Sequence, residues 1–246
     1  IAGGGIGGLA AALALAQKGM ASLVLEKASK LGEIGAGIQL GPNAFHCFDR
    51  LGVGETARRM AVYIDSLRLM DSMADGEICH IDLGEAFRQR FGNPYAVVHR
   101  GDLHGVLLKA CQDHPLVALR VSSEVTGYEQ DAEGVAARLA TGEVVRGAAL
   151  VGADGLWSNV RKQMIGDSAR VSGHTTYRSV IPTEQMPEAL RWNAATLWAG
   201  PKCHIVHYPL SGWKVFNLVV TYHNNAPEPV AGKPVPVEEV QRGFGH

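Results

Sequence analysis

The stretch GGGIGG at residues 3–8 decides the fold. Its glycines at positions 3, 5 and 8 match the pattern GxGxxG, which joins a buried strand to a helix in Rossmann-like folds. Gly3 permits the tight turn, Gly5 lets the backbone approach a pyrophosphate, and Gly8 lets the helix pack closely on the sheet. The helix predicted over residues 6–18 would direct its positive end at the phosphates.

An acidic residue follows at the distance that a dinucleotide-binding unit requires. A short apolar strand is predicted at residues 22–25, and Glu26 stands at its end, 18 residues after Gly8. A carboxylate at this place accepts hydrogen bonds from the ribose hydroxyls of the adenosine. Predicted strands and helices continue to alternate through residues 1–165, which is typical of a doubly wound sheet.

Composition and charge exclude several classes of protein. The chain has 246 residues, of which 46% are hydrophobic and 19% charged, and its formal net charge is -1. Such a chain is globular and lacks the basic field that binds nucleic acid. Its longest apolar run, residues 9–16, is far shorter than the roughly 20 residues of a membrane span, and no signal peptide is visible. The four cysteines have no zinc spacing, so we expect reduced thiols and a cytoplasmic location.

A second, β-rich region interrupts the first. Residues 63–93 and 172–225 favour antiparallel strands with some helix, and they are separated in the sequence. We therefore predict an α/β protein with two interleaved domains: a Rossmann-like domain of residues 1–62 and 94–171, and a β-rich domain of residues 63–93 and 172–225. Residues 226–246 are predicted to be a proline-rich linker and the start of a further C-terminal part, since both ends of the chain look cut.

Several motifs beyond the glycine stretch carry a family resemblance. They are GAGI at residues 35–38, PNA at 42–44, HRGDL at 99–103 and GADGLWSNVR at 152–161. In this order they resemble the single-component flavoprotein aromatic hydroxylases, which are FAD-dependent monooxygenases with a Rossmann-like FAD-binding domain and a β-rich substrate domain. Members of that family also carry a later GDAAHP-like segment that contacts the flavin, and we expect it beyond residue 246.

The resemblance implies FAD as a bound cofactor and NADH, or alternatively NADPH, as co-substrate. It implies that Glu26, with Lys27 beside it, holds the FAD ribose and that Arg100 lies near the phosphates or ribose. Val125 would lie near the adenine and Asp154 near the ribityl–pyrophosphate region. The expected cofactor-binding residues are Gly3, Gly5, Gly8, Glu26, Lys27, Ala36, Gly37, Ile38, Arg100, Val125, Asp154 and Gly155.

The strand predicted at residues 204–208 carries the candidate catalytic residues. Side chains two apart on a strand share a face, so His204 and Tyr208 would point one way and His207 the other. This stretch resembles the family members that hydroxylate 3-hydroxybenzoate at its 6-position to give gentisate. The resemblance implies that His204 takes the proton of the phenol and that Tyr208 hydrogen-bonds nearby, with Gln39 and Leu40 at the edge of the pocket. His207 is the rival base if the strand faces the other way.

The chemistry favours such a base, because a phenolate directs electron density to the carbon para to its oxygen, which is the 6-position of 3-hydroxybenzoate. The expected partners are a small aromatic acid and O2, without nucleic acid, and a homodimer is possible. Three alternatives stay open: a salicylate 1-hydroxylase, a flavin dehydrogenase that does not oxygenate, and a non-catalytic flavin-binding remnant.

Overall fold

The structure is a computed structural model that describes residues 1–32, 36–242 and 244, so Gly35 of the GAGI motif lies outside the described residues. The chain divides into two compact units. Unit 1 comprises residues 1–35, 47–57 and 100–169, and unit 2 comprises residues 36–46, 58–99 and 170–246. Residues 36–46, 58–62, 94–99 and 170–171, which are predicted to belong to the Rossmann-like domain, lie in unit 2.

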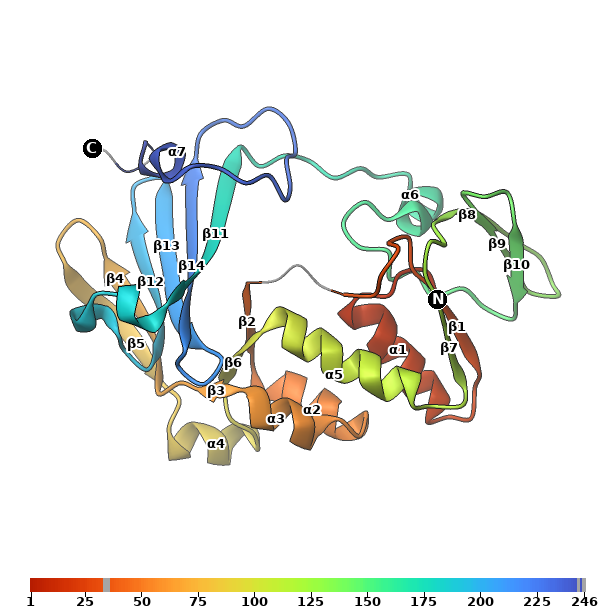
Figure 1. Cartoon of the computed structure of the whole chain (residues 1–246), viewed down its shortest axis with the longest axis horizontal. Coiled ribbons are helices and arrows are strands. Elements are labelled where there is room, and N and C mark those ends of the chain that lie inside the picture. Colours follow the sequence, from red (N-terminus) through yellow and green to blue (C-terminus); the bar gives the residue numbers. More distant parts are fainter. Residues whose placement is uncertain (33–35, 243, 245–246) are drawn as a thin grey trace. The chain divides into compact units, whose positions relative to one another are not determined.

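Unit 1 is built around parallel strand pairing. Strand β1 (Ser22–Leu25) pairs in parallel with β7 (Val117–Arg120) (Figure 1). Ala2 forms parallel bridges to Leu25 and Gly152. Helices α1 (Ile6–Ala16) and α5 (Arg100–Gln112) belong to the same unit. The buried residues of α1 include Leu9, Leu13 and Ala16, the spacing from which its helix is predicted. These elements confirm the predicted Rossmann-like α/β class.

The rest of unit 1 is an antiparallel meander and a short helix. Strand β9 (Val135–Leu139) pairs with both β8 (Val125–Gln130) and β10 (Val144–Gly147). Helix α6 (Asn159–Ile165) is capped by Ser158 and ends at Gly166, whose φ of 76° favours glycine. The core here contains Ala2, Leu25, Val125, Ala137, Leu139 and Val160.

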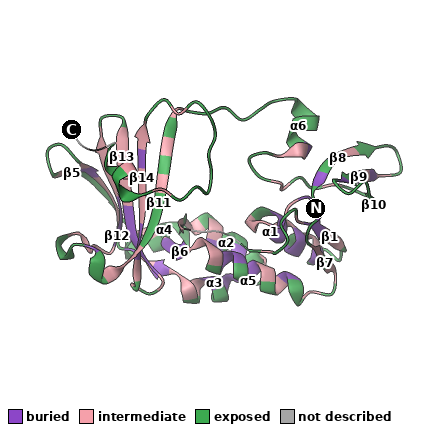
Figure 2. Cartoon of the chain, turned by 45° about the horizontal axis from the view of Figure 1, so that its top comes forward, coloured by how far each residue is buried: buried purple, intermediate pink, exposed green. Residues whose placement is uncertain are grey.

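Unit 2 contains a six-stranded sheet with the order β11-β14-β13-β12-β4-β5 (Figure 1). Its strands are β11 (His174–Pro182), β14 (Val215–His223), β13 (Cys203–Leu210), β12 (Ala194–Gly200), β4 (Ser66–Asp71) and β5 (Gly76–Asp82). The β12–β4 pair is parallel and the other pairs are antiparallel. Exposed and half-buried residues alternate along the first half of β11, as expected of an edge strand (Figure 2).

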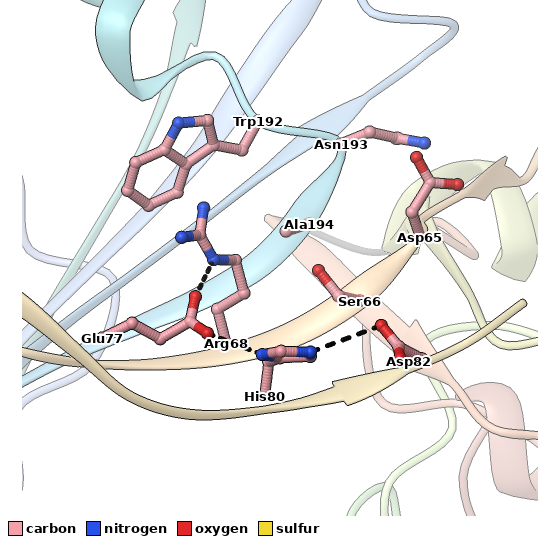
Figure 3. A pocket seen from close by; sticks show the side chains of 9 residues that line it. All are labelled: Asp65, Ser66, Arg68, Glu77, His80, Asp82, Trp192, Asn193 and Ala194. Carbon is pink, nitrogen blue, oxygen red and sulfur yellow. Dashed lines mark hydrogen bonds and ion pairs between the residues drawn. The ribbon is translucent and has the colours of Figure 1, made fainter.

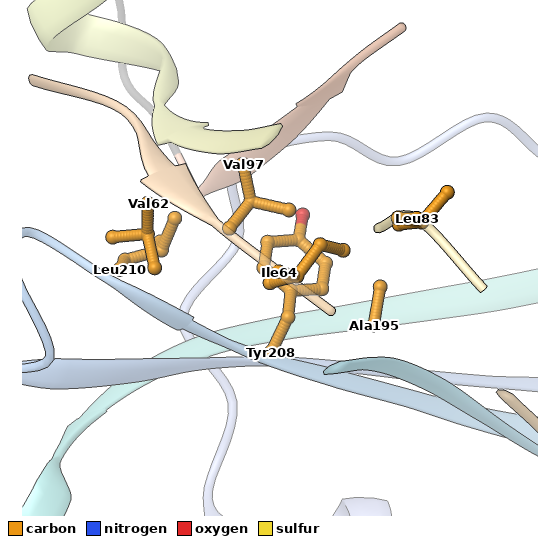
Figure 4. Packing of buried hydrophobic residues seen from close by; sticks show 7 residues of the cluster. All are labelled: Val62, Ile64, Leu83, Val97, Ala195, Tyr208 and Leu210. Carbon is orange, nitrogen blue, oxygen red and sulfur yellow. The ribbon is translucent and has the colours of Figure 1, made fainter. Parts of the chain in front are cut away.

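A smaller sheet packs on one face of the large one. It consists of β2 (Gly37–Leu40), β6 (Ala96–His99) and β3 (Val62–Tyr63), with β6 in the middle. The core between the sheets contains Val62, Ile64, Leu83, Val97, Ala195, Tyr208 and Leu210 (Figure 4). Tyr208 therefore points from the large sheet toward the small one.

The remaining elements are short. They are α2 (Pro42–Arg50), α3 (Gly54–Met60), α4 (Glu85–Phe91), α7 (Val237–Gln241) and the 3-10 turns Thr183–Gln185 and Glu188–Leu190. Helix α2 begins at the proline of the PNA motif, as predicted, because proline suits the first turn of a helix. Within the described ranges, no helix has the length and apolar character needed to cross a membrane.

Candidate functional site

A cavity of about 440 Å³ lies in unit 1 among the segments that carry the nucleotide motifs. Its volume is in the range typical of small-molecule sites. The predicted cofactor-binding residues that line it are Gly3, Gly5, Glu26, Lys27, Arg100, Val125, Asp154 and Gly155. The structure thus brings together eight residues that the sequence spreads over residues 3–155.

The motif glycines are required by close backbone approaches. Gly3 has a φ of 103°, and a Cβ there would lie 2.3 Å from the carbonyl oxygen of Ala153. A Cβ on Gly8 would lie 1.9 Å from the carbonyl oxygen of Gly3, so Gly8 allows α1 to approach the loop. Gly5 precedes α1 and offers no side-chain cap, which leaves the first amides of the helix available to an anion in the cavity.

Glu26 fixes the glycine loop to the end of β1. Its Oε2 accepts a hydrogen bond of 2.7 Å from the amide of Gly4, and its Oε1 accepts one of 2.8 Å from the amide of Ala28. A carboxylate has about four acceptor positions, so two remain for ribose hydroxyls. The predicted ribose acid therefore also acts as a brace for the loop.

Asp154 organises the opposite wall of the cavity. It accepts hydrogen bonds from the hydroxyl of Ser158 and, at 3.2 Å, from the amide of Val160. The Ser158 hydroxyl in turn accepts from the amide of Arg161 at 2.9 Å and caps α6. The side chain of Arg161 forms an exposed ion pair with Asp167 and does not line the cavity.

Sequence reasoning missed two residues that hold this site. His104 is 2% exposed, and its Nε2 lies 2.9 Å from the carbonyl oxygen of Gly4. Because a carbonyl only accepts, Nε2 carries the proton. Asn159 donates from Nδ2 to the carbonyl oxygen of Val125 at 2.9 Å. No local pattern indicates either contact, since both join segments far apart in the sequence.

The donor set of the cavity suits a dinucleotide. Helix-start amides and the cations Lys27 and Arg100 favour phosphates, while Glu26 offers acceptors for ribose hydroxyls. Glycines stand where a Cβ would collide with backbone. The residues present therefore fit the FAD that the motifs imply.

In unit 2, the register of β13 separates the candidate catalytic residues by face. His204 pairs with Thr221 and Tyr208 with Asn217, and these side chains share one face. His204 is half-buried, and among the described residues its imidazole has no hydrogen-bond partner. Tyr208 is 3% exposed, and burial raises the pKa of its hydroxyl to about 12.

His207 occupies the other face of β13. Its Nε2 accepts a hydrogen bond of 3.1 Å from the indole N–H of Trp198, and the residue is 2% exposed. Burial, with a smaller effect of Arg68, lowers its pKa to about 4. The imidazole is therefore neutral near pH 7 and its lone pair is engaged, which is unsuitable for a base.

The predicted residues of β2 lie beside Tyr208. The amide of Gly37 donates to Oδ1 of Asn217 at 2.8 Å, and Gln39 accepts from the hydroxyl of Tyr95 at 2.6 Å. Gln39 is exposed, whereas Leu40 is 4% exposed and belongs to the core. Ala36, Gly37 and Ile38, predicted to bind the cofactor, lie in unit 2 and do not line the cavity of unit 1.

A second cavity, of about 340 Å³, opens on the sheet of unit 2 (Figure 3). Arg68 lies 3.8 Å from the ring centre of Trp192 and pairs with Glu77 at 2.6 Å. His80 bridges Glu77 and Asp82 at 2.6 and 3.5 Å. These side chains contact one another and join β4 to β5, so we assign the cluster a structural role.

Comparison with known proteins gives consistent results. Residues 1–197 match the family described as FAD binding domain. The chain is 60% identical over 245 residues to 3-hydroxybenzoate 6-hydroxylase 1 of Aquipseudomonas alcaligenes, covering 99% of this chain and 62% of that protein. It is 52% identical over 244 residues to 3-hydroxybenzoate 6-hydroxylase of Polaromonas naphthalenivorans, covering 99% of this chain and 61% of that protein.

Solved structures share the fold. Klebsiella pneumoniae HpxO complexed with FAD and uric acid has a TM-score of 0.80 and 26% identity, covering 99% of this chain and 60% of that chain. The tetrameric form of 2-methyl-3-hydroxypyridine-5-carboxylic acid oxygenase has a TM-score of 0.79 and 25% identity, covering 99% and 63%. The chain thus spans about three fifths of the length of these relatives.

Proposed function

Because the chain belongs to the FAD-binding-domain family, we propose that it forms part of an FAD-dependent monooxygenase that converts 3-hydroxybenzoate to gentisate. In the balanced reaction, 3-hydroxybenzoate, O2, NADH and a proton give gentisate, NAD⁺ and water. The 60% identity to a 3-hydroxybenzoate 6-hydroxylase over 99% of this chain is the observation that carries this proposal.

The cavity of unit 1 would hold the nucleotide portion of FAD. The amides at the start of α1, with Lys27 and Arg100, would bind the phosphates, and Glu26 would accept from a ribose. Asp154 would set the opposite wall through its bonds to Ser158 and Val160. When bound, FAD supplies the redox chemistry that takes electrons from NADH and activates O2.

The substrate would use the face of the large sheet that carries His204. A ring nitrogen of an imidazole can accept a proton, so His204 suits the task of taking the proton from the 3-hydroxyl group. The resulting phenolate is electron-rich at its para carbon, the 6-position. Tyr208 and Gln39 would shape the pocket, and the buried Leu40 would support it from the core.

The charge of the same face suits an aromatic acid. Strands β11, β14, β13 and β12 contain a single Lys or Arg, which is Arg178, and no Asp or Glu. Arg178 pairs with Val219, which pairs with Val206, so Arg178 shares the face of His204 and Tyr208. A guanidinium binds a carboxylate in a charge-assisted hydrogen bond, which supports a benzoate as the substrate.

The test is a substrate panel with the full-length protein. FAD and NADH would be supplied with 3-hydroxybenzoate, salicylate and 4-hydroxybenzoate, and NADH use, O2 use and products would be measured. We expect gentisate from 3-hydroxybenzoate. Catechol and carbon dioxide from salicylate would instead identify a salicylate 1-hydroxylase, and NADH oxidation by an organic acceptor without oxygen incorporation would identify a dehydrogenase.

We also infer NADH rather than NADPH as the co-substrate, a cytoplasmic location and a homodimer. The similarity to 3-hydroxybenzoate 6-hydroxylases supports the first inference, because NADH is the typical co-substrate of such enzymes. A tetrameric form of a structural neighbour supports self-association of this fold. Comparing kcat/KM for the two nucleotides tests the first inference, and measuring molar mass by light scattering tests the last, which a monomer would overturn.

A further inference from the structure

We propose that Asn217 is a positioning residue of the substrate face, holding the backbone of Gly37 against the ring of Tyr208. The inference rests on the proposed function for its kinetic consequence. Asn217 lies on β14, is 0% exposed and accepts the hydrogen bond of 2.8 Å from the Gly37 amide through Oδ1. This bond joins residues 180 apart in the sequence.

The orientation of the Asn217 amide follows from this bond. The Gly37 N–H requires an acceptor, so Oδ1 faces Gly37 and Nδ2 points away. Nδ2 is buried and has no hydrogen-bond partner among the residues that the structure describes. A buried donor without a partner is destabilising, because it has lost its hydrogen bond to water. An apolar residue here would leave the Gly37 N–H without this acceptor, so the side-chain hydrogen bond that Asn217 makes serves to hold Gly37.

Tyr208 holds the same backbone unit from a second side. A Cβ on Gly37 would lie 2.3 Å from Cε2 and 2.6 Å from Oη of Tyr208, so the strand passes directly against the ring. Tyr208 is also the residue that pairs with Asn217 in the sheet. Two cross-strand neighbours thus clamp one peptide of β2, one by a hydrogen bond and the other by contact.

The clamp determines where the rest of β2 lies. Gln39 follows Gly37 by two residues and accepts from the Tyr95 hydroxyl at 2.6 Å. Displacement of Gly37 would move Gln39 and release the ring of Tyr208, both of which we place in the substrate pocket. Loss of the Asn217 acceptor should therefore weaken substrate binding while the cavity of unit 1 is preserved.

The experiment compares three variants of the full-length protein. Asn217→Leu keeps the approximate volume and removes the acceptor, whereas Asn217→Asp keeps an acceptor for Gly37 and removes the Nδ2 donor. Thr196→Val is the matched control, because Thr196 is 0% exposed with an unpartnered Oγ1 among the described residues, on the opposite face of the same sheet. The readouts are KM, kcat, gentisate formed per NADH, FAD affinity, and hydrogen exchange of a peptide covering residues 36–40.

We expect Asn217→Leu to raise KM about 10-fold, equivalent to one buried hydrogen bond, and to increase exchange in residues 36–40. FAD affinity should stay within about 2-fold of the wild-type value. In Asn217→Asp, KM should be close to that of the wild-type protein, and residues 36–40 should again be protected from hydrogen exchange. The proposal is overturned if Asn217→Leu leaves exchange and KM unchanged, or if Thr196→Val has the same effects.

Two further arms separate the possible failures. If Asn217→Leu does not fold, Gly37→Ala tests the same clamp by pressing a Cβ against Tyr208, and an unchanged KM would contradict the proposal. If the wild-type protein does not hydroxylate 3-hydroxybenzoate, the proposed function fails. The exchange measurement then still decides whether Asn217 holds residues 36–40.

Discussion

The indole N–H of Trp198 donates a hydrogen bond of 3.1 Å to Nε2 of His207, diagonally across the β12–β13 pair, in which Trp198 faces Ile205 and His207 faces Thr196. The imidazole also lies 6.0 Å from the Trp192 ring and 6.3 Å from the Phe216 ring, measured between centroids. Protonation of Nε2 would break the hydrogen bond and place a charge in this aromatic surrounding. The side-chain hydrogen bond from Trp198 on β12 to His207 on β13 therefore exists only while His207 is neutral.

This arrangement predicts acid sensitivity of the fold. Burial lowers the pKa of His207 to about 4, whereas the ordinary value is 6.5. Between these values the unfolded chain binds a proton that the folded chain does not, so stability falls as pH decreases through this window. The slope reaches at most about 1.4 kcal/mol per pH unit. Thermal unfolding followed from about pH 7.5 down to about pH 4 should show this decline.

His207→Gln removes the titration while an amide oxygen can still accept from Trp198. We expect this variant to lose part of the decline in unfolding temperature between about pH 6.5 and about pH 4. Parallel pH profiles for the variant and the wild-type protein would contradict the role assigned to His207.

Gly8→Ala should abolish FAD binding or folding of unit 1. The added Cβ would lie 1.9 Å from the carbonyl oxygen of Gly3, which forces α1 away from the glycine loop. Gly105→Ala is the matched control, since Gly105 lies exposed inside α5, where an added Cβ would meet no atom within 4 Å. It should be neutral or stabilising by about 0.5–1 kcal/mol. FAD titration by fluorescence and thermal unfolding measure both; equal effects would refute the steric argument.

The parts of the site that could be predicted from the sequence are the local ones. The spacing of Gly3, Gly8 and Glu26 lies within a single strand–helix–strand unit, and the strand alternation places His204 and Tyr208 on one face. Both signals depend on short-range backbone geometry, which a single sequence carries.

The remaining contacts depend on chain segments that meet only in the folded protein. The bond from His104 to the Gly4 carbonyl spans 100 residues, and that from Gly37 to Asn217 spans 180. No residue next to His104 or Asn217 in the sequence indicates which distant segment each of them contacts. Short elements such as β3, with two residues, and β10, with four, carry too few positions for a periodic pattern.

Asp154→Asn should loosen the start of α6 and weaken FAD binding. The carboxylate accepts from both the Ser158 hydroxyl and the Val160 amide, whereas one end of an asparagine amide cannot accept. We expect a loss of about 1–2 kcal/mol in unfolding free energy. Asp167→Asn, which affects the exposed pair with Arg161 after the same helix, should cost less than about 0.5 kcal/mol. A larger loss for Asp167→Asn would contradict this ranking in denaturant titrations.

His204→Ala should leave FAD affinity unchanged and slow hydroxylation. Removal of the imidazole takes away the proton acceptor that we propose for the phenol, and general base catalysis contributes typically about 10²–10⁴-fold to rate. We expect less gentisate per NADH, because reducing equivalents are then lost without ring hydroxylation. His207→Ala, on the other face, removes the hydrogen bond to Trp198. This variant should lower the unfolding temperature and leave the yield of gentisate per NADH close to the wild-type value. Coupled turnover at the wild-type rate in His204→Ala would remove His204 from this role.

Arg178→Met should weaken binding of anionic substrates selectively. Arg178 lies on β11 and shares the face of the large sheet that carries His204 and Tyr208. A hydrogen bond to a charged group contributes about 1.5–3 kcal/mol, so KM for 3-hydroxybenzoate should rise about 10–100-fold. The uncharged analogue 3-hydroxybenzamide should be affected much less, and Lys214→Met, at an exposed cation just before β14, should not discriminate between the two. Equal loss for the acid and the amide in Arg178→Met would show that Arg178 does not recognise the carboxylate.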